Sequence, residues 1–360
     1  MGQNAPHYKL DFLPPPKEKV ETIEILRQTN KSAAALAELK GIAKTIPNQA
    51  MLINAIVLQE AKDSSEVENI ITTQDELYKA LTANKSTQSI ETKEVVNYRK
   101  AIFSGFNIVK KQGFIRVNDI IDIQQELVDN IAGIRSTPGT VLKNDKTDEI
   151  VYTPPQDKAE IQELLTNFIN HYNQKNTELS PLINLAILHY QFESIHPFYD
   201  GNGRTGRIIN ILYLILNELI DVPILYLSSY LIKNKTEYYR LLNKTNQDGE
   251  WGNWIIFMLK AVESTSRDTI IKITNIKNLL DNTIIKVQNE SPKIYRKELV
   301  ELLFEQPYSK IDFVVARLGV ERKAASRYLK ELEEIGVLKS QKVGREILYI
   351  NKELIKILKQ

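Results

Sequence analysis

The 360-residue sequence contains no cysteine, which excludes disulfide bonds and thiolate metal sites and favours a reducing compartment. Its net charge at pH 7 is only +2, so the overall charge indicates no class of partner. The N-terminal stretch MGQNAPHYKLDFLPPP lacks an apolar core of signal-peptide length. The most apolar run, residues 208–220, is interrupted by two asparagines and a glutamate and is too short to span a bilayer. We therefore expect a cytoplasmic protein without a membrane segment.

The remaining composition is that of a soluble globular protein, with 42% hydrophobic and 26% charged residues. A chain of this length exceeds one ordinary core, so two or three domains are expected. Helical periodicity covers residues 20–81, with a break at Pro47, and returns in residues 93–133. Residues 49–81 predict two helices with a joint near residues 62–65. No internal repeat or low-complexity tract is present.

Residues 136–155, STPGTVLKNDKTDEIVYTPP, interrupt the helical pattern with two short β-prone runs, TVL and EIVYT. The polar segment KNDKTD between them predicts a turn and therefore a β-hairpin. An isolated hairpin is marginally stable unless it packs on another element. From the residues alone, this hairpin is either a surface excursion or part of a site.

The last 70 residues have the pattern of a separate small domain. KELVELLFEQ, IDFVVARLG and ERKAASRYLKELEEIGVL predict three short helices, and KSQKVGREILYINK predicts two strands joined at Gly344. This is the order of a winged helix. Residues 291–360 hold 15 Lys plus Arg against 10 Asp plus Glu, a mildly basic balance that suits nucleic acid without requiring it. A protein-interaction or dimer module is the other interpretation of this domain.

Residues 196–207, HPFYDGNGRTGR, place glycine and charge directly before the apolar segment IINILYLILNELI. Ser180 followed by Pro181 predicts the start of the helix that leads into this stretch. Gly201, Asn202, Gly203 and Gly206 are expected to free the backbone for positive φ and close approach. The first N–H groups of the helix that follows would form an anion site, strengthened by the helix dipole.

The side chains of this stretch favour a phosphate site with a metal ligand and a base. Arg204 and Arg207 are three residues apart and share one side of the first helical turn, where they can grip phosphate oxygens. Asp200 is a hard oxygen ligand suited to Mg²⁺ bound to phosphates, and His196 can act as a base near neutral pH. The pattern is neither a Walker A loop nor a G-x-G-x-x-G that follows a strand.

The twelve residues resemble the signature of the Fic family, H-x-F-x-[D/E]-G-N-G-R-x-x-R, with every defined position present. The likeness extends through IPNQAMLINAI, the hairpin, HYQFESIHPF, PILYLSSYL and the C-terminal segment, and is closest to the SoFic-type bacterial protein adenylyltransferases. The resemblance implies a mainly α fold, with a Fic helical core, a small β-hairpin flap and a C-terminal winged-helix (α+β) domain. It also implies transfer of AMP from ATP to a Ser, Thr or Tyr hydroxyl of a target protein.

The resemblance assigns roles to individual residues. His196 would be the general base, Asp200 would hold Mg²⁺ between the ATP phosphates, and Phe198 would anchor the loop in the core. Asn202, Gly203 and Arg204 would form the anion hole, and Arg207 would bind the γ-phosphate. Tyr239 would lie by the adenine, unless it is a core aromatic. The implied ATP-contacting residues are Glu68, His196, Gly201, Asn202, Gly203, Arg204, Thr205, Gly206, Arg207 and Tyr239. The flap at 136–155 would pin the target by strand addition.

A second stretch, SSEVENI, matches the family's inhibitory motif [S/T]-x-x-x-E-[G/N] at Ser64, Glu68 and Asn69. Ser64 and Glu68 are four residues apart and share a helix face. By resemblance, Glu68 would pair with Arg207, block the γ-phosphate site and leave ATP in an unproductive pose. The plain alternative is a solvated glutamate on a polar helix. Some family members use this glutamate to remove AMP again, so the reverse reaction stays open. Other members transfer phosphocholine or phosphate instead of AMP.

Two function hypotheses follow from these features. The first is a self-inhibited adenylyltransferase that uses ATP and Mg²⁺ and docks a target protein on the flap, with a homodimer possible. The second is a nucleotide-sensing DNA-binding regulator that acts through basic side chains near the third helix of the C-terminal segment, namely Arg322, Lys323, Arg327 and Lys330. The expected domains are an N-terminal region with the inhibitory helix (1–92), the catalytic core with the flap (93–264), a linker helix (265–290) and the winged-helix domain (291–360).

Overall fold

The computed structural model describes residues 9–82, 89–143, 149–175 and 177–359 of the chain. Across these residues the chain is mainly helical, with one two-stranded and one three-stranded antiparallel sheet. The predicted fold class is thereby confirmed. In chain order the elements are α1 (Lys17–Val20), α2 (Ile23–Ala43), α3 (Gln49–Val67), α4 (Gln74–Thr82), α5 (Ile90–Gln112), α6 (Val117–Val128), β1 (Leu142–Lys143), β2 (Ile150–Tyr152), α7 (Lys158–Tyr172), α8 (Pro181–Ile195), α9 (Asn202–Leu216), α10 (Ser228–Lys233), α11 (Lys235–Asp248), α12 (Trp251–Glu290), α13 (Lys297–Glu305), β3 (Tyr308–Ser309), α14 (Ile311–Leu318), α15 (Arg322–Glu334), β4 (Lys339–Val343), β5 (Glu346–Ile350) and α16 (Lys352–Lys359).

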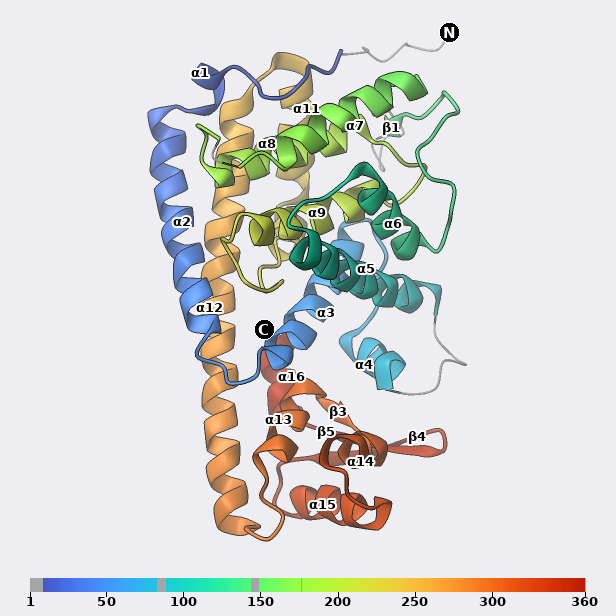
Figure 1. Ribbon diagram of the computed structural model, residues 1–360. Helices are drawn as coiled ribbons and strands as arrows, with labels where there is room; N and C mark the ends of the chain where they lie inside the picture. Colours follow the sequence, from blue (N-terminus) through green and yellow to red (C-terminus); the bar gives the residue numbers. More distant parts are fainter. Residues whose placement is uncertain (1–8, 83–88, 144–148, 176, 360) are drawn as a thin grey trace.

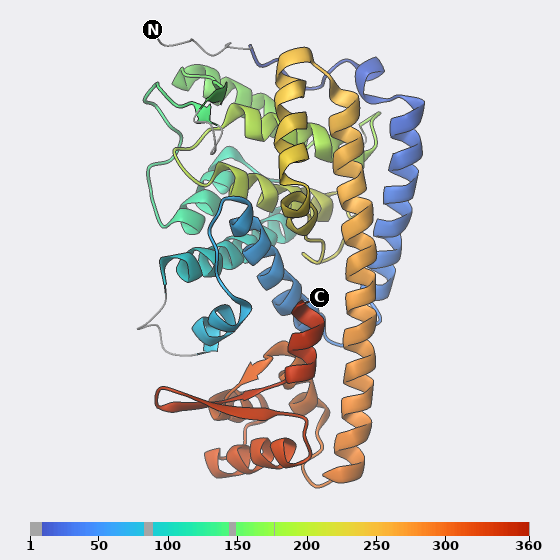
Figure 2. The ribbon, with the colours of Figure 1, turned by 180° about the vertical axis from the view of Figure 1, so that it is seen from behind.

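The helix α12 is 40 residues long and runs along one side of the whole molecule, with α2 beside its upper half (Figures 1 and 2). Its buried residues recur at helical spacing, as Ile255, Leu259 and Val262 do, so one continuous apolar stripe faces the core. The expected linker helix, 265–290, is therefore only the second part of this element. No proline interrupts residues 251–290, and the apolar stripe continues without a break, so the helix does too. The division into domains itself stays a prediction.

Two helices, α8 and α9, form the centre of the upper part of the molecule (Figure 1). Ser180 caps α8 as predicted, because its hydroxyl accepts the N–H of Leu182 at 3.3 Å and Pro181 follows at the first helical position. Every residue of α8 after Pro181 is buried, which is the pattern of a core helix surrounded by protein. The connection from α8 to α9 contains the glycine-rich stretch.

The joint predicted at residues 62–65 is wrong, because α3 runs through these residues and ends at Val67. Ser64 and Ser65 are buried inside the helix, and the Ser65 hydroxyl is satisfied by the carbonyl of Ala61 at 2.8 Å. The connection to α4 lies at residues 68–73 instead. A pair of serines is typical of a helix boundary, but here both are buried by packing, and the Ser65 hydroxyl bonds a carbonyl of the preceding helical turn.

The predicted hairpin is confirmed in the described residues, where β1 pairs antiparallel with β2 and Leu142 lies opposite Tyr152. Most of its expected turn, residues 144–148, lies outside the described residues. The hairpin does not stand alone, since Ile134 forms an antiparallel bridge with Phe198 just before it. Docking of this kind provides the support that a two-stranded hairpin needs.

The C-terminal segment forms three helices followed by a hairpin, as predicted, with Gly344 at the hairpin turn in the left-handed region (φ 58°). Two elements were not predicted, the short strand β3 and the helix α16, and the sheet order is β3-β5-β4. This segment lies beside the C-terminal part of α12 (Figure 2), and α16 returns to touch α3. None of the helices in the described residues is both long and apolar enough to cross a membrane.

Candidate active site

The loop between α8 and α9 is fixed at both of its ends by left-handed residues. His196 ends α8 with φ 48°, and its N–H bonds the carbonyl of Phe192 at 3.1 Å. Gly201 caps α9 with φ 77°, where a Cβ would lie 2.7 Å from Val128. The side-chain oxygen of Asn202 accepts the N–H of Phe198, and its side-chain nitrogen donates to the carbonyl of Phe198, both at 2.8 Å. The loop is therefore held in one shape before any ligand arrives.

Of the four residues expected to free the backbone for positive φ and close approach, only Gly201 adopts a positive φ. Gly203 and Gly206 lie inside α9, where they permit close approach instead. A Cβ on Gly203 would lie 2.6 Å from an oxygen of Glu68, and one on Gly206 would lie 2.5 Å from an oxygen of Glu193. The glycines thus open space for two carboxyl groups beside the first turn of α9.

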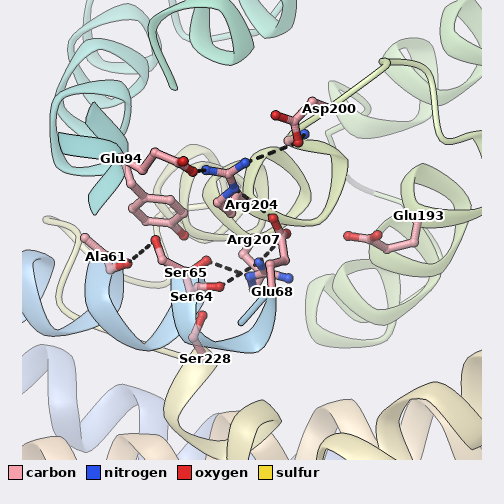
Figure 3. Close-up of polar contacts among 12 residues, drawn as sticks. Ala61, Ser64, Ser65, Glu68, Glu94, Glu193, Asp200, Arg204, Arg207 and Ser228 are labelled. Atoms are coloured by element: carbon pink, nitrogen blue, oxygen red, sulfur yellow. Dashed lines mark hydrogen bonds and ion pairs between the residues drawn. The ribbon is translucent and has the colours of Figure 1, made fainter. Parts of the chain in front are cut away.

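The carboxylate of Glu68 bridges the two arginines of the loop (Figure 3). One oxygen accepts from Nη2 of Arg207 at 2.8 Å, and the other accepts from Nε of Arg204 at 2.8 Å. Arg207 also donates to the hydroxyl of Ser64 at 2.6 Å and to the Ser64 carbonyl at 2.9 Å. The structure therefore brings the predicted residues of two distant stretches together, and it adds the contact with Arg204, which the sequence did not suggest.

Asn69, the third position of the second stretch, shapes the end of α3. Asn69 adopts φ 63°. Its N–H donates to the carbonyl of Glu66, and the N–H of Ile70 donates to the carbonyl of Ser65, each at 3.0 Å. These two bonds define a Schellman motif, whose left-handed position favours glycine or asparagine. This explains why the motif allows only those residue types after the glutamate. Asn69 also accepts a hydrogen bond from Lys235 at 3.0 Å.

Glu94 of α5 is a site residue that sequence reasoning missed. It accepts from Nη1 of Arg204 at 2.6 Å, while Asp200 accepts from Nη2 of the same guanidinium at 3.3 Å. With Glu68, three carboxylates surround Arg204, whose side chain is almost fully buried. No local pattern marks Glu94, because it reaches the site only through the packing of α5 on α9.

Two further acidic residues are buried around Arg207. Glu60 accepts from Tyr98 at 3.1 Å and from the hydroxyl and N–H of Ser228 at 2.5 and 3.2 Å. Glu193 points toward Glu68 from α8 (Figure 3), and its Oε1 has no hydrogen-bond partner among the described residues. Burial raises the pKa of each carboxyl to about 7, opposed at Glu60 first by the hydrogen bonds from Ser228 and then by Arg207, and at Glu193 by the Arg207 cation.

His196 carries a neutral imidazole at physiological pH. Desolvation of the ring, and secondly the nearby Arg135 cation, lower the pKa of His196 to about 4, while Asp200 acts in the opposite direction. Its Nδ1 has no hydrogen-bond partner within the described ranges. A neutral imidazole can accept a proton from an incoming hydroxyl group, so the predicted base has the protonation state that this role requires.

Asp200 is the most exposed of the three carboxylates around Arg204, with 68% of its side chain accessible. Its carboxylate accepts the N–H of Gly201 at 2.6 Å, besides the contact with Arg204. The described part of the chain contains no cluster of three or more His, Cys, Asp or Glu side chains that could hold a metal ion. A divalent cation here would depend on one carboxylate together with oxygens of a ligand, which is how proteins commonly hold Mg²⁺.

The remaining predicted residues occupy distinct positions. Phe198 is 1% exposed and packs near Phe192, with ring centroids 6.4 Å apart, so it anchors the loop in the core. Thr205 is buried in α9. Tyr239 is 41% exposed, so the alternative that it is a core aromatic is wrong. The core aromatic is its neighbour Tyr238, whose ring centroid lies 5.0 Å from that of Tyr239.

The fold and site together define a class: a helical protein in which a carboxylate at the end of one helix pairs with two buried arginines at the start of another. Residues 26–107 match the N-terminal region of the Fic/DOC family, residues 114–214 match the Fic/DOC family itself, and residues 279–354 match the C-terminal domain of SoFic-like protein adenylyltransferases. The chain belongs to the Fic/DOC family.

Curated relatives match part of this chain at modest identity. The protein adenylyltransferase Fic of Nematostella vectensis is 25% identical over 178 residues, 49% of this chain and 39% of that protein. Protein adenylyltransferase fic-1 of Caenorhabditis elegans is 26% identical over 195 residues, 52% of this chain and 35% of that protein. The chain thus spans well under half the length of these relatives.

Solved structures share the fold over a larger part of the chain. A Fic family protein from Desulfovibrio desulfuricans G20 superposes with a TM-score of 0.59 at 17% identity, over 92% of this chain and 96% of that one. Fic-1 from C. elegans superposes with a TM-score of 0.53 at 18% identity, over 70% of this chain and 74% of that one. At such identities the likeness shows the fold.

Proposed function

We propose that this protein is a self-inhibited protein adenylyltransferase that transfers AMP from ATP to a Ser, Thr or Tyr hydroxyl of a target protein. The carrying observation is the carboxylate of Glu68, bound by Arg204 and Arg207 at the start of α9. Two buried guanidinium groups at a helix N-terminus form a site for a phosphate chain. In this structure the carboxylate of Glu68, at the end of α3, compensates their charge. Relatives named protein adenylyltransferases support the reaction type.

The proposed reaction begins with His196. Its neutral imidazole takes the proton from the target hydroxyl, whose oxygen then attacks the α-phosphorus of ATP. The new O–P bond forms as the bond from the α-phosphorus to the oxygen bridging the α- and β-phosphates breaks, and diphosphate leaves. The proton stays on His196 until it is lost to solvent. The low pKa of His196 keeps the base available over the physiological pH range.

The start of α9 would stabilise the charge that builds up on the phosphates. The backbone N–H groups from Asn202 onward and the guanidinium groups are fixed by α9 and by the loop before any ligand binds, so little reorganisation is needed. While Glu68 stays in place, Arg207 is not free to bind the γ-phosphate. ATP would then lie in a pose that does not lead to transfer.

Asp200 fits the role of Mg²⁺ ligand, because it is an exposed hard-oxygen group at the mouth of the phosphate site. Mg²⁺ held there would neutralise charge on the departing diphosphate. The flap would bind the target chain by adding a strand to the hairpin edge, and Tyr239, half-exposed on α11, would lie beside the adenine.

The test is labelling with ATP that is radioactive at the α-phosphate, alongside ATP radioactive at the γ-phosphate, in a cell extract with Mg²⁺. Compared with the wild type, Glu68→Gly is expected to raise transfer of α-label about 10-fold or more, because Arg207 becomes available to substrate. His196→Ala is expected to abolish it. Glu66→Gln is the matched control, because Glu66 lies two residues before Glu68, pairs with Lys62 and has no salt bridge to either arginine in the described residues.

The outcomes separate the parts of the proposal. Transfer of γ-label only would indicate phosphate transfer rather than AMP transfer. Strong wild-type labelling that Glu68→Gly leaves unchanged would remove the inhibitory role of Glu68. An equal rise with Glu66→Gln would show that any loosening of the end of α3 suffices.

The alternative function, a DNA-binding regulator, is not favoured. The basic side chains Lys323, Arg327 and Lys330 of α15 line a groove of about 950 Å³ that also contains Glu290, Glu331 and Glu334. Arg322 is paired with Asp312. This mixture of charges is a poor match for a polyanion. The assignment of the C-terminal segment as a winged helix, a homodimer and the removal of AMP by the same site remain predictions.

A further inference from the structure

Arg135, which lies just before the hairpin, is fully buried yet forms no salt bridge with a carboxylate of the described chain. Its guanidinium donates instead to backbone carbonyl groups: Nε to His196 at 2.7 Å, and Nη2 to Ile195 at 3.4 Å and to Pro155. Its own N–H bonds the carbonyl of Pro197 at 2.9 Å. Burying an unpaired cation is costly, so a packing role alone does not explain an arginine here.

The partners of Arg135 belong to two different parts of the site. Ile195 and His196 end α8 and include the proposed base. Pro155 lies in the second arm of the hairpin, after β2, whereas Arg135 itself lies in the first arm, before β1. One guanidinium group therefore joins both arms of the flap to the backbone of the base.

Tyr199 forms a second connection between the flap and the catalytic loop. Its phenolic oxygen accepts the N–H of Ser136 at 2.9 Å and the N–H of Thr137 at 3.2 Å, with the Thr137 hydroxyl also at 3.2 Å. Tyr199 lies between His196 and Asp200 in the loop, so it ties the first arm directly to the catalytic residues.

The two arms are also joined to each other. The side chain of Gln156 accepts the N–H of Gly139 at 2.6 Å and donates to the carbonyl of Thr140 at 2.9 Å. Tyr152 of β2 donates to the carbonyl of Ser194 at 3.0 Å, near the end of α8. The stem of the flap is therefore cross-linked and attached to the loop at several points.

We propose that Arg135 and Tyr199 are positioning residues that fasten the flap to the catalytic loop, so that a target strand paired with the flap presents its hydroxyl to His196. The inference rests on the proposed adenylyl transfer and extends it to residues with no assigned role. A displacement of about 1 Å between reacting groups can lower a rate about 100-fold, so a firm attachment matters for transfer. Neither residue touches Arg204 or Arg207, so nucleotide affinity is expected to be independent of both.

The experiment uses the full chain in the Glu68→Gly background. Tyr199→Phe removes the accepting oxygen from a half-exposed side chain and is expected to fold. Arg135→Lys keeps the charge but cannot reach three carbonyl groups. The matched control is Arg99→Lys, a part-buried arginine of α5 that bonds Asn54 at 2.8 Å and lies away from the loop. Three quantities are measured: α-label transfer to protein in a cell extract, the Kd for an α,β-methylene analogue of ATP with Mg²⁺, and amide hydrogen exchange over residues 136–142.

Tyr199→Phe and Arg135→Lys are expected to lower transfer about 10-fold or more and to speed exchange over residues 136–142, with the Kd unchanged within about 2-fold. Arg99→Lys is expected to change none of the three. Transfer within about 2-fold of the parent for Tyr199→Phe would overturn the proposal, as would a Kd that weakens in parallel with transfer. If the Glu68→Gly parent transfers no α-label, the proposed adenylyl transfer itself fails. In that case, hydrogen exchange over residues 136–142 that Tyr199→Phe and Arg135→Lys leave unchanged would also overturn the proposed attachment of the flap to the loop.

Discussion

Arg204 and Arg207 carry guanidinium cations, yet both side chains are almost fully buried. Glu68 supplies the compensating charge to both, with Glu94 and Asp200 adding to it at Arg204. Leaving a buried charge without its partner costs about 3–5 kcal/mol. Removal of Glu68 therefore makes binding of a phosphate chain more favourable at the same place, which is the physical basis of the expected activation.

The neutral state of His196 can be measured directly. Desolvation, with the Arg135 cation second, places its pKa at about 4, so the imidazole is expected to stay neutral from pH 8 to about 5. Since the unfolded chain binds this proton near pH 6.5, His196 contributes nothing to the pH dependence above 6.5 and destabilises the fold progressively as the pH falls from 6.5 toward 4. An NMR titration of ¹³C-histidine-labelled protein gives the midpoint, with His196→Asn assigning the resonance. A midpoint at or above 6.5 contradicts this prediction.

At the scale of elements, the end of α3 places the inhibitory carboxylate. Glu68 is the last residue before the left-handed Asn69, so its side chain leaves the helix beside the first turn of α9. Glu60 anchors the same helix two turns earlier through Tyr98 and Ser228. The position of Glu68 therefore depends on the backbone of one helix end as well as on its ion pairs.

Asn69→Val tests the role of that helix end. A β-branched residue in the left-handed region costs about 1–2 kcal/mol, so α3 should lose its last turn and transfer of α-label should rise, with a lower melting temperature. Asn69→Gly is the control, because glycine adopts the same φ while losing the amide that accepts from Lys235. Activation by glycine equal to that by valine would show that the amide contacts, rather than the backbone, hold Glu68.

At the scale of the whole molecule, the C-terminal domain packs against the two helices that flank Glu68 (Figure 2). Tyr308 of β3 stacks on Tyr78 of α4 with ring centroids 5.2 Å apart. Lys310 donates to the carbonyl of Thr82 at 2.7 Å, and Gln74 donates to that of Leu358 in α16 at 3.2 Å. This domain therefore supports the connection between α3 and α4 from outside the catalytic core.

Tyr308→Ala is expected to weaken this support. Loss of an aromatic pair costs about 0.5–1.5 kcal/mol beyond its buried area, so the melting temperature should fall and α-label transfer should rise about 2- to 10-fold. Tyr308→Phe keeps the stacked ring and loses only the hydroxyl bonded to Asp75, so it should behave as the wild type. Initial rates of labelling and calorimetric melting measure both effects. A destabilised alanine variant with unchanged transfer would show that the domain does not influence Glu68.

Much of the local structure is predictable because its causes are local. Ser180 and Pro181 mark the start of α8 by capping chemistry, and two β-prone runs with a polar turn between them at 136–155 mark a hairpin. The motif residues of α9 cluster because one helical turn places them together. The pairing of Glu68 with Arg207 was accessible only through resemblance, since the two residues are 139 positions apart in the chain.

The sequence by itself determined the helical periodicity, the cap of α8, the hairpin and the chemistry of the loop, because periodicity, capping and charge act over a few residues. Tertiary structure alone decided the rest. The helix α3 continues through Ser64 and Ser65 because packing buries them, and the stripe of α12 is covered by α2 and α8 and also by α13 and α16. Glu94, Glu193 and Arg135 became site residues only when distant elements packed together, since burial and ion pairing depend on neighbours that no local pattern records.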